Sequence, residues 1–185
     1  MSGIRVASLS ASHRSRVEEI VRATRVFSED EVAVALEVFD AAIPADMGHV
    51  RSPKSAVKPD YELLGAFEGD RLLGYACFGP TPSTDRTYDL YWIAVHPAAQ
   101  RSGVGAALMT EAERQLEERR ARLVIIETSS RDDYTPTRRF YEKRGYVEAA
   151  RLRDFYAPGD DRLVLSKRFG SIDPNGNAAV SPHTA

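Results

Sequence analysis

One loop carries the residue types and spacing best suited to bind an anion: Gln100-Arg101-Ser102-Gly103-Val104-Gly105-Ala106. Two glycines separated by one residue let the backbone approach a ligand closely. The helix predicted to follow begins with unpaired N–H groups and with the positive end of its dipole. These features predict a cradle for a phosphate or pyrophosphate, although tight packing of the helix would also explain the glycines.

The loop differs from two familiar nucleotide-binding loops. It lacks the Gly-Lys-Ser/Thr ending of a P-loop. It also lacks the third glycine of a dinucleotide-binding fingerprint, because Leu108 stands where that glycine should be. The loop comes in the middle of the chain, after a predicted hairpin, so a nicotinamide-dependent dehydrogenase is disfavoured.

The elements that must position this loop follow from hydrophobic periodicity. Helical spacing predicts helices over residues 12–27, 28–43, 103–120 and 135–144. Apolar runs and alternation predict strands over residues 4–7, 61–67, 72–78, 86–95, 123–126, 146–154 and 162–169. Residues 44–60 are rich in Pro and polar residues, and they are predicted to form either a substrate-side loop or a solvated connection. The anion-binding loop therefore lies between a strand and a helix.

Three local signals predict where helices begin and end. Ser28 and Glu31 have the spacing of a capping box. Thr135 is predicted to be an N-cap, with Pro136 at the first helical position. Gly145 can adopt the left-handed conformation that ends the same helix.

Size, charge and composition exclude several classes of protein. The 185 residues suit one globular domain, predicted over residues 1–169, with a flexible tail at 170–185. The formal net charge of -2 gives no reason to expect nucleic-acid binding. The single cysteine, Cys77, excludes an internal disulfide, and the histidines show no metal-ligand spacing, so no metal is expected. No run approaches the roughly 20 apolar residues that span a bilayer, so we expect no membrane association and a cytoplasmic location.

Two segments at a characteristic separation carry a family resemblance. The first matches the pattern Gln/Arg-x-x-Gly-x-Gly/Ala from Gln100 to Gly105, directly after the strand end Ile93-Ala94-Val95-His96-Pro97. The second is an aromatic-Tyr pair before Gly-aromatic, Phe140-Tyr141-Glu142-Lys143-Arg144-Gly145-Tyr146. Both segments resemble signatures of the GNAT N-acetyltransferase superfamily. The resemblance covers residues 1–169 and is strongest in the second half.

This resemblance implies a mixed α/β (α+β) fold. Its central mixed, mostly antiparallel sheet of six to seven strands would be flanked by about four helices and splayed after the Ile93 strand. It also implies acetyl-CoA as the cofactor, with CoA as the product. By carry-over, Ile93, Ala94 and Val95 would line the pantetheine arm, and the loop from Gln100 to Ala106 would hold the pyrophosphate.

Three residues are candidates for the proton transfers that acetylation of an amine requires. The resemblance places Tyr141 near the thioester sulfur, where its hydroxyl can protonate the departing thiolate; packing against Phe140 is the alternative. Asp89, on the predicted 86–95 strand, and Glu127, at the end of an apolar run, are the candidate general bases. For each of them, pairing with a nearby arginine or relay by water alone is the alternative.

Two further residues are predicted to contact the cofactor, Tyr134 and Arg138. The family commonly has Asn seven positions before the signature Tyr, and here Tyr134 holds that place. Arg138 could instead be an exposed helix residue. Residues 154–156 and 160–161 resemble the closing hairpin of members that modify peptide N-termini, with a solvated acidic turn as the alternative.

The sequence therefore predicts an acetyl-CoA-dependent N-acetyltransferase, a monomer or homodimer. Its acceptor would be a primary amine, whether a small amine, an amino acid or a peptide N-terminus, that attacks directly in a ternary complex. Two other classes stay open. A CoA-binding regulatory or interaction module would bind acetyl-CoA without turnover, and a generic nucleotide-binding fold would bind ATP or NAD and no CoA.

Overall fold

A computed structural model describes residues 3–43 and 61–170 of the chain. The strands are β1 (Arg5–Ser8), β2 (Glu62–Glu68), β3 (Arg71–Pro80), β4 (Thr87–Val95), β5 (Leu123–Ser129), β6 (Val147–Ala157) and β7 (Asp160–Arg168). The helices are α1 (Arg14–Thr24), α2 (Glu29–Ala42), α3 (Val104–Glu118) and α4 (Thr135–Glu142), with 3₁₀ turns η1 (Ala11–His13), η2 (Pro97–Ala99) and η3 (Asp132–Tyr134). Each predicted helix and strand has a counterpart. The predicted loop 44–60 and the tail beyond residue 170 lie outside the described residues.

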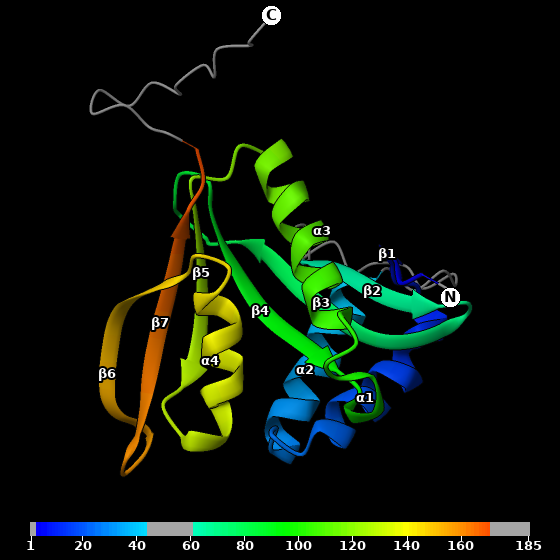
Figure 1. The fold of residues 1–185 in the computed structure, drawn as a ribbon, viewed down its shortest axis with the longest axis horizontal. Helices are drawn as coiled ribbons and strands as arrows, with labels where there is room; N and C mark the ends of the chain where they lie inside the picture. Colours follow the sequence, from blue (N-terminus) through cyan, green and yellow to red (C-terminus); the bar gives the residue numbers. More distant parts are fainter. Residues whose placement is uncertain (1–2, 44–60, 171–185) are drawn as a thin grey trace, which may run out of the picture. The chain divides into compact units, whose positions relative to one another are not determined.

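The seven strands hydrogen-bond in the order β1-β2-β3-β4-β5-β7-β6 (Figure 1). The pairs β1 with β2, β2 with β3, β5 with β7 and β6 with β7 are antiparallel. With the four α-helices of the described residues, this order confirms the predicted fold class, a mixed α/β fold with a mostly antiparallel central sheet. The splay after the Ile93 strand stays a prediction.

The contacts within the chain group it into two compact units. The first unit comprises Met1–Pro80 and Leu90–Arg114, and the second comprises Thr81–Asp89 and Gln115–Ala185. The anion-binding loop belongs to the first unit, and the candidate proton-transfer residues belong to the second. The single domain predicted over residues 1–169 stays a prediction.

In the first unit, α1 and α2 pack against each other, α1 contacts β3 and α2 contacts β2 (Figure 1). Their apolar stripes recur at helical spacing and are buried in one cluster with strand residues. The members of this cluster include Val17, Ile20, Val21, Val32, Leu36, Phe39, Leu63, Phe67, Leu72, Tyr75 and Cys77. The capping box predicted at the start of α2 is confirmed, since Glu31 N–H donates to Ser28 Oγ at 3.3 Å and Ser28 N–H to Glu31 Oε2 at 2.7 Å.

Two of the differences between the predicted and observed helix ends have a local explanation. The first helix ends at Thr24, because Arg25 adopts a left-handed φ of 58°. Thr135 is the first residue of α4 and Tyr134 is its N-cap, so the predicted N-cap is one residue too late. Gly145 has a φ of 86°, which confirms the left-handed stop after α4.

In the second unit, β6 and β7 form a long hairpin beside β5 (orange in Figure 1). Both strands are longer than predicted. Asp154 therefore lies inside β6, and Asp160 and Asp161 begin β7. A solvated acidic turn is wrong for Asp160, whose exposure is only 7%.

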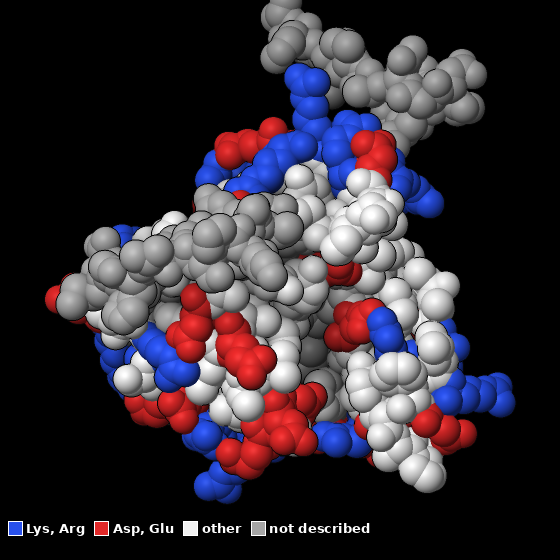
Figure 2. All heavy atoms as spheres, turned by 180° about the vertical axis from the view of Figure 1, so that it is seen from behind, with Lys and Arg blue, Asp and Glu red and all other residues white. Residues whose placement is uncertain are grey.

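Charged side chains of both signs lie on the face of the molecule that Figure 2 draws. Figure 2 shows Lys and Arg side chains alongside Asp and Glu on the face that it draws, in line with the formal net charge of -2. Among the described helices, none is long and apolar enough to cross a membrane.

Candidate functional site

The end of β4 is fixed just before the anion-binding loop. The N–H of His96 donates to the carbonyl of Leu73 at 2.8 Å, and His96 Nδ1 accepts from the N–H of Ala98 at 3.2 Å. Gly74 allows β3 to approach closely, because a Cβ there would lie 2.7 Å from the carbonyl oxygen of Ala94. The loop therefore starts from a constrained strand end.

The loop itself turns through two left-handed residues. Arg101 has a φ of 62° and Gly103 a φ of 88°, while Ser102 Oγ donates to the carbonyl of Ala99 at 2.7 Å. The N–H of Ala107 donates to the carbonyl of Gly103 at 2.9 Å, as the first turn of α3 requires. Residues 104–106 come before Ala107, in the first turn of α3. The N–H groups of a first helical turn have no intrahelical partners.

This geometry fits a pyrophosphate. Gln100, Arg101, Ser102, Gly103 and Ala106 are exposed, whereas Val104 is buried. The start of α3 is thus anchored by the Val104 side chain, while the loop residues before it are exposed. The amides, the positive end of the helix dipole and the charge of Arg101 all favour an anion there. Which amides contact CoA stays a prediction.

The three strand residues predicted to line the pantetheine arm are the last of β4. Ile93 and Val95 are half-buried, and Ala94 is buried at 3% exposure. Successive side chains of a strand point to opposite faces of the sheet, which explains why Ala94 is more buried than Ile93 and Val95. Their contact with the arm stays a prediction.

Tyr141, the candidate general acid, is buried on α4 with 3% exposure. Its ring packs edge-on against Phe140 and Tyr146, with centroids 5.3 and 5.9 Å away. Burial raises the pKa of the Tyr141 hydroxyl well above the ordinary tyrosine value, because a phenolate there would lose its solvation. The hydroxyl therefore stays protonated across the neutral range and has a proton to donate.

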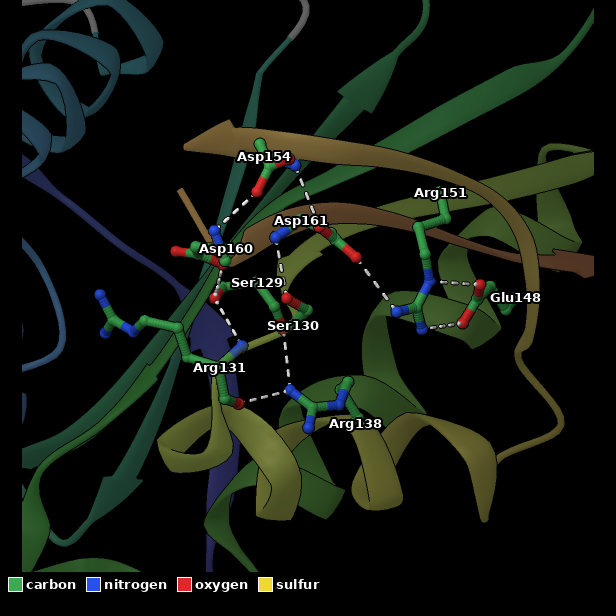
Figure 3. A network of polar contacts seen from close by, with 10 residues as sticks. Ser129, Ser130, Arg131, Arg138, Glu148, Arg151, Asp154, Asp160 and Asp161 are labelled. Carbon is green, nitrogen blue, oxygen red and sulfur yellow. Dashed lines mark hydrogen bonds and ion pairs between the residues drawn. The ribbon is translucent and has the colours of Figure 1, made fainter. Parts of the chain in front are cut away.

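Arg138 points toward the residues that follow β5 (Figure 3). Its Nη1 donates to the carbonyls of Ser129 at 2.9 Å and Arg131 at 2.7 Å, and its Nη2 donates to Thr135 Oγ1 at 2.7 Å. The guanidinium thus ties the first turn of α4 to the end of β5. Tyr134 is half-buried, with the Arg131 guanidinium 5.3 Å from its ring centre. Cofactor contact by Arg138 and Tyr134 stays a prediction.

A second part of this network joins the end of β5 to the start of β7 (Figure 3). The Ser129 hydroxyl donates to Asp160 Oδ1 at 2.5 Å. Ser130 and Asp161 exchange two bonds, from Ser130 N–H to the Asp161 carbonyl at 3.0 Å and from Asp161 N–H to Ser130 Oγ at 2.8 Å. These bonds fix both residues that precede Arg162.

The outer strand β6 bulges away from β7 between residues 152 and 157. Asp154, with a φ of 51°, lies in this bulge, and its N–H donates to Asp161 Oδ1 at 3.0 Å. The bulge leaves Phe155 and Tyr156 exposed at 49% and 47%. The start of β7 therefore sets the position of two aromatic side chains.

The two candidate bases have different partners. Asp89 is half-buried, and its Oδ2 accepts from Thr81 Oγ1 at 2.7 Å. Glu127 is exposed and forms an ion pair with Arg162 of β7. Pairing with an arginine, which the sequence left open, is thus found for Glu127.

Arg162 is a residue of interest that the sequence did not predict. It lies directly opposite Ser129 in the β5–β7 register, so Glu127, Ser129 and Arg162 share one face of the sheet. The sequence signal that could have identified Arg162 is the alternation of residues along β7. This alternation becomes informative only once the pairing of β7 with β5 is known.

In the described part of the chain, no three His, Cys, Asp or Glu residues gather in a way that could hold a metal ion. A family model described as "Acetyltransferase (GNAT) family" matches residues 25–146. The chain belongs to the GNAT acetyltransferase family. This confirms the resemblance found in the two signatures.

Solved structures agree with the GNAT assignment. The chain is 37% identical to a putative GNAT acetyltransferase from Desulfovibrio desulfuricans, with a TM-score of 0.77 over 90% of this chain and 98% of that one. Comparison with curated proteins gave no match.

More distant GNAT structures share the fold. One is the ribosomal-protein-S18-alanine N-acetyltransferase of Escherichia coli, with 19% identity and a TM-score of 0.71 over 94% of this chain and 98% of that one. Another is the PaiA N-acetyltransferase of Thermoplasma acidophilum in complex with coenzyme A, with 16% identity and a TM-score of 0.64 over 90% and 99%. At these identities the likeness supports the fold alone.

Proposed function

We propose that this GNAT acetyltransferase moves an acetyl group from acetyl-CoA to a primary amine by direct attack in a ternary complex. The anion-binding loop carries this proposal. Its two left-handed residues, its exposed residues 100–103 and the N-terminus of α3 that follows them suit the pyrophosphate of CoA. The PaiA structure contains CoA, and a further neighbour from Salmonella typhimurium contains acetyl-CoA, which supports the same donor here.

The chemistry assigns a task to each candidate residue. Bound acetyl-CoA supplies a thioester carbonyl that an amine can attack. An alkyl ammonium has a pKa of roughly 10, so a carboxylate of this chain accepts its first proton, directly or through water. As the carbon–nitrogen bond forms, the carbon–sulfur bond breaks and its electron pair leaves on sulfur, to which Tyr141 gives its proton. The nitrogen then loses a second proton, which restores the tyrosine hydroxyl through solvent.

The pH dependence of two variants separates the candidate bases. We expect Glu127→Gln or Asp89→Asn to remove the acidic limb of the pH–rate profile, because the missing carboxylate can no longer accept the amine's proton. Both carboxylates stay candidates, since that of Glu127 pairs with Arg162 and that of Asp89 accepts a hydrogen bond from Thr81. The measurement is kcat/KM as a function of pH in the wild type and in both variants. If both variants keep the limb, neither carboxylate is the base.

Acceptor-dependent release of CoA thiol tests the activity. We propose three acceptor classes: a small amine, an amino acid and a peptide N-terminus. Neighbours named for a ribosomal-protein alanine and for an aminoglycoside share the fold, so the fold alone does not select among them. Binding of acetyl-CoA with no release on any acceptor would instead favour the regulatory or interaction module.

The protein's own thiol will not interfere with that assay. Cys77 is buried at 1% exposure, and burial raises the pKa of its thiol to about 12. Because the thiolate is the reactive form, we expect no labelling by a thiol reagent in the folded protein at neutral pH and one labelled thiol per chain in denaturant. Rapid labelling of the folded protein would show that the Cys77 environment is open.

A further inference from the structure

The ion pair between Glu127 and Arg162 offers two opposite charges side by side on one face of the second unit. We propose that this pair recognises the acceptor as a free α-amino acid, with Glu127 receiving the ammonium and Arg162 the carboxylate. This inference rests on the proposed N-acetyltransferase function and narrows its three acceptor classes to one.

The backbone at Arg162 is held firmly by its neighbours. The two preceding residues, Asp160 and Asp161, are bonded to Ser129 and Ser130 at the end of β5 (Figure 3). Because Arg162 also lies opposite Ser129 in the β5–β7 ladder, its position relative to Glu127 is set by strand pairing. A site with this support is organised before any ligand arrives.

The Arg162 guanidinium is held from a second side by an aromatic ring. Its central carbon lies 4.9 Å from the centre of the Phe155 ring, and Phe155 is placed there by the bulge that Asp161 anchors. Stacking on the ring keeps the plane of the guanidinium oriented, while its Nη2 contacts Glu127. The Nε of Arg162 is buried and has no hydrogen-bond partner among the described residues.

The pair is open enough to exchange partners. The side chains of Arg162 and Glu127 are 28% and 42% exposed, and ion pairs with this much exposure are weak. An α-amino acid carries an ammonium and a carboxylate on the same carbon. Such a ligand can replace one ion pair with two, because the guanidinium gains a carboxylate as Glu127 gains the ammonium.

Plain amines and peptide N-termini fit the pair less well. Each has an ammonium and no adjacent carboxylate, so it would have to displace Arg162 from Glu127. The guanidinium would then lose its carboxylate partner and gain none, so such an acceptor only exchanges one weak ion pair for another. The arrangement therefore discriminates against amines that lack a neighbouring carboxylate.

Matched acceptors test this inference. A panel of L-amino acids, each compared with its own primary amide, would be assayed for kcat/KM by CoA release. The pairs would be tested in the wild type and in Arg162→Gln, Arg162→Lys and Arg168→Gln. Arg168 is an exposed arginine on the same strand, so it controls for the loss of one positive charge. Binding of acetyl-CoA to each variant checks that it is folded.

We expect the wild type and Arg168→Gln to prefer acids over amides by about ten-fold or more, the worth of one charge-assisted hydrogen bond. Arg162→Gln should lose that preference through a higher acceptor KM, and Arg162→Lys should retain part of it. Equal use of acids and amides by the wild type, or an unchanged preference in Arg162→Gln, would overturn the inference alone. Absence of release with every acid and every amide would also overturn the inference, and absence of release with small amines and a short peptide as well would overturn the proposed function.

Discussion

Replacing Tyr141 with Phe should lower kcat by about ten-fold or more, since positioned proton transfer is worth at least that much. The affinity for acetyl-CoA should change little, because the substitution keeps the ring that packs against Phe140 and Tyr146. Steady-state kinetics with a working acceptor, together with direct titration of acetyl-CoA, provide the measurement.

Tyr146→Phe is the matched control for this experiment. Tyr146 is buried, and its ring contacts that of Tyr141, so the variant removes a hydroxyl from the same aromatic cluster. We expect its kcat to stay close to the wild-type value. If Tyr141→Phe and the wild type have equal kcat, Tyr141 is not the general acid and its role is packing.

The pH profile of the wild type adds a constraint on Tyr141. Burial raises the pKa of its hydroxyl, so the proton is retained at a higher pH than in an exposed tyrosine. Ionisation of Tyr141 therefore cannot produce a loss of activity as the pH rises toward about 10, the ordinary tyrosine value.

Replacing Gly103 with Ala should weaken acetyl-CoA binding by about ten-fold or more, the worth of one hydrogen bond to a charged group. Gly103 has a φ of 88°, and a side chain in the left-handed region costs about 1–2 kcal/mol. Relief of that strain would rotate the amides that start α3 away from the anion. Calorimetric titration with CoA and acetyl-CoA measures the loss.

Gly69→Ala controls for backbone strain alone. Gly69 has a φ of 58° in the turn between β2 and β3, and an added Cβ there would meet nothing within 4 Å. Both variants should lose similar thermal stability, while only Gly103→Ala should lose affinity. Equal affinity for acetyl-CoA in the two variants would contradict the assignment of the loop as the pyrophosphate site.

The sequence predicted the elements well because most of them carry a local signal. The stripes of α1 and α2 followed from helical spacing, and the Ser28 capping box was confirmed in both of its bonds. The two signatures around Gly103 and Tyr141 identified the family, because they combine fixed residue types with a fixed separation. Thr135 was assigned one residue too late as an N-cap, since its hydroxyl accepts from Arg138 instead.

Features that depend on strand register could not be predicted in the same way. Arg162 meets Glu127 only because β7 lies between β5 and β6, an order that no local pattern encodes. The bulge at Asp154 depends on a carboxylate from the following strand, so the sequence ended the strand at Asp154 where the structure continues it to Ala157. Contacts between side chains on different strands could therefore be identified only from the structure.

Transfer of an isotopically labelled acetyl group tests the central claim most directly. The purified protein would be incubated with labelled acetyl-CoA and a mixture of amino acids, amino acid amides, small amines and a short peptide. Mass spectrometry would then follow every acceptor and the CoA released. Our account predicts labelled acetyl on an amine nitrogen in an amount equal to the CoA released, with the label on free amino acids before other acceptors. Tight binding of acetyl-CoA with no labelled amine would contradict it.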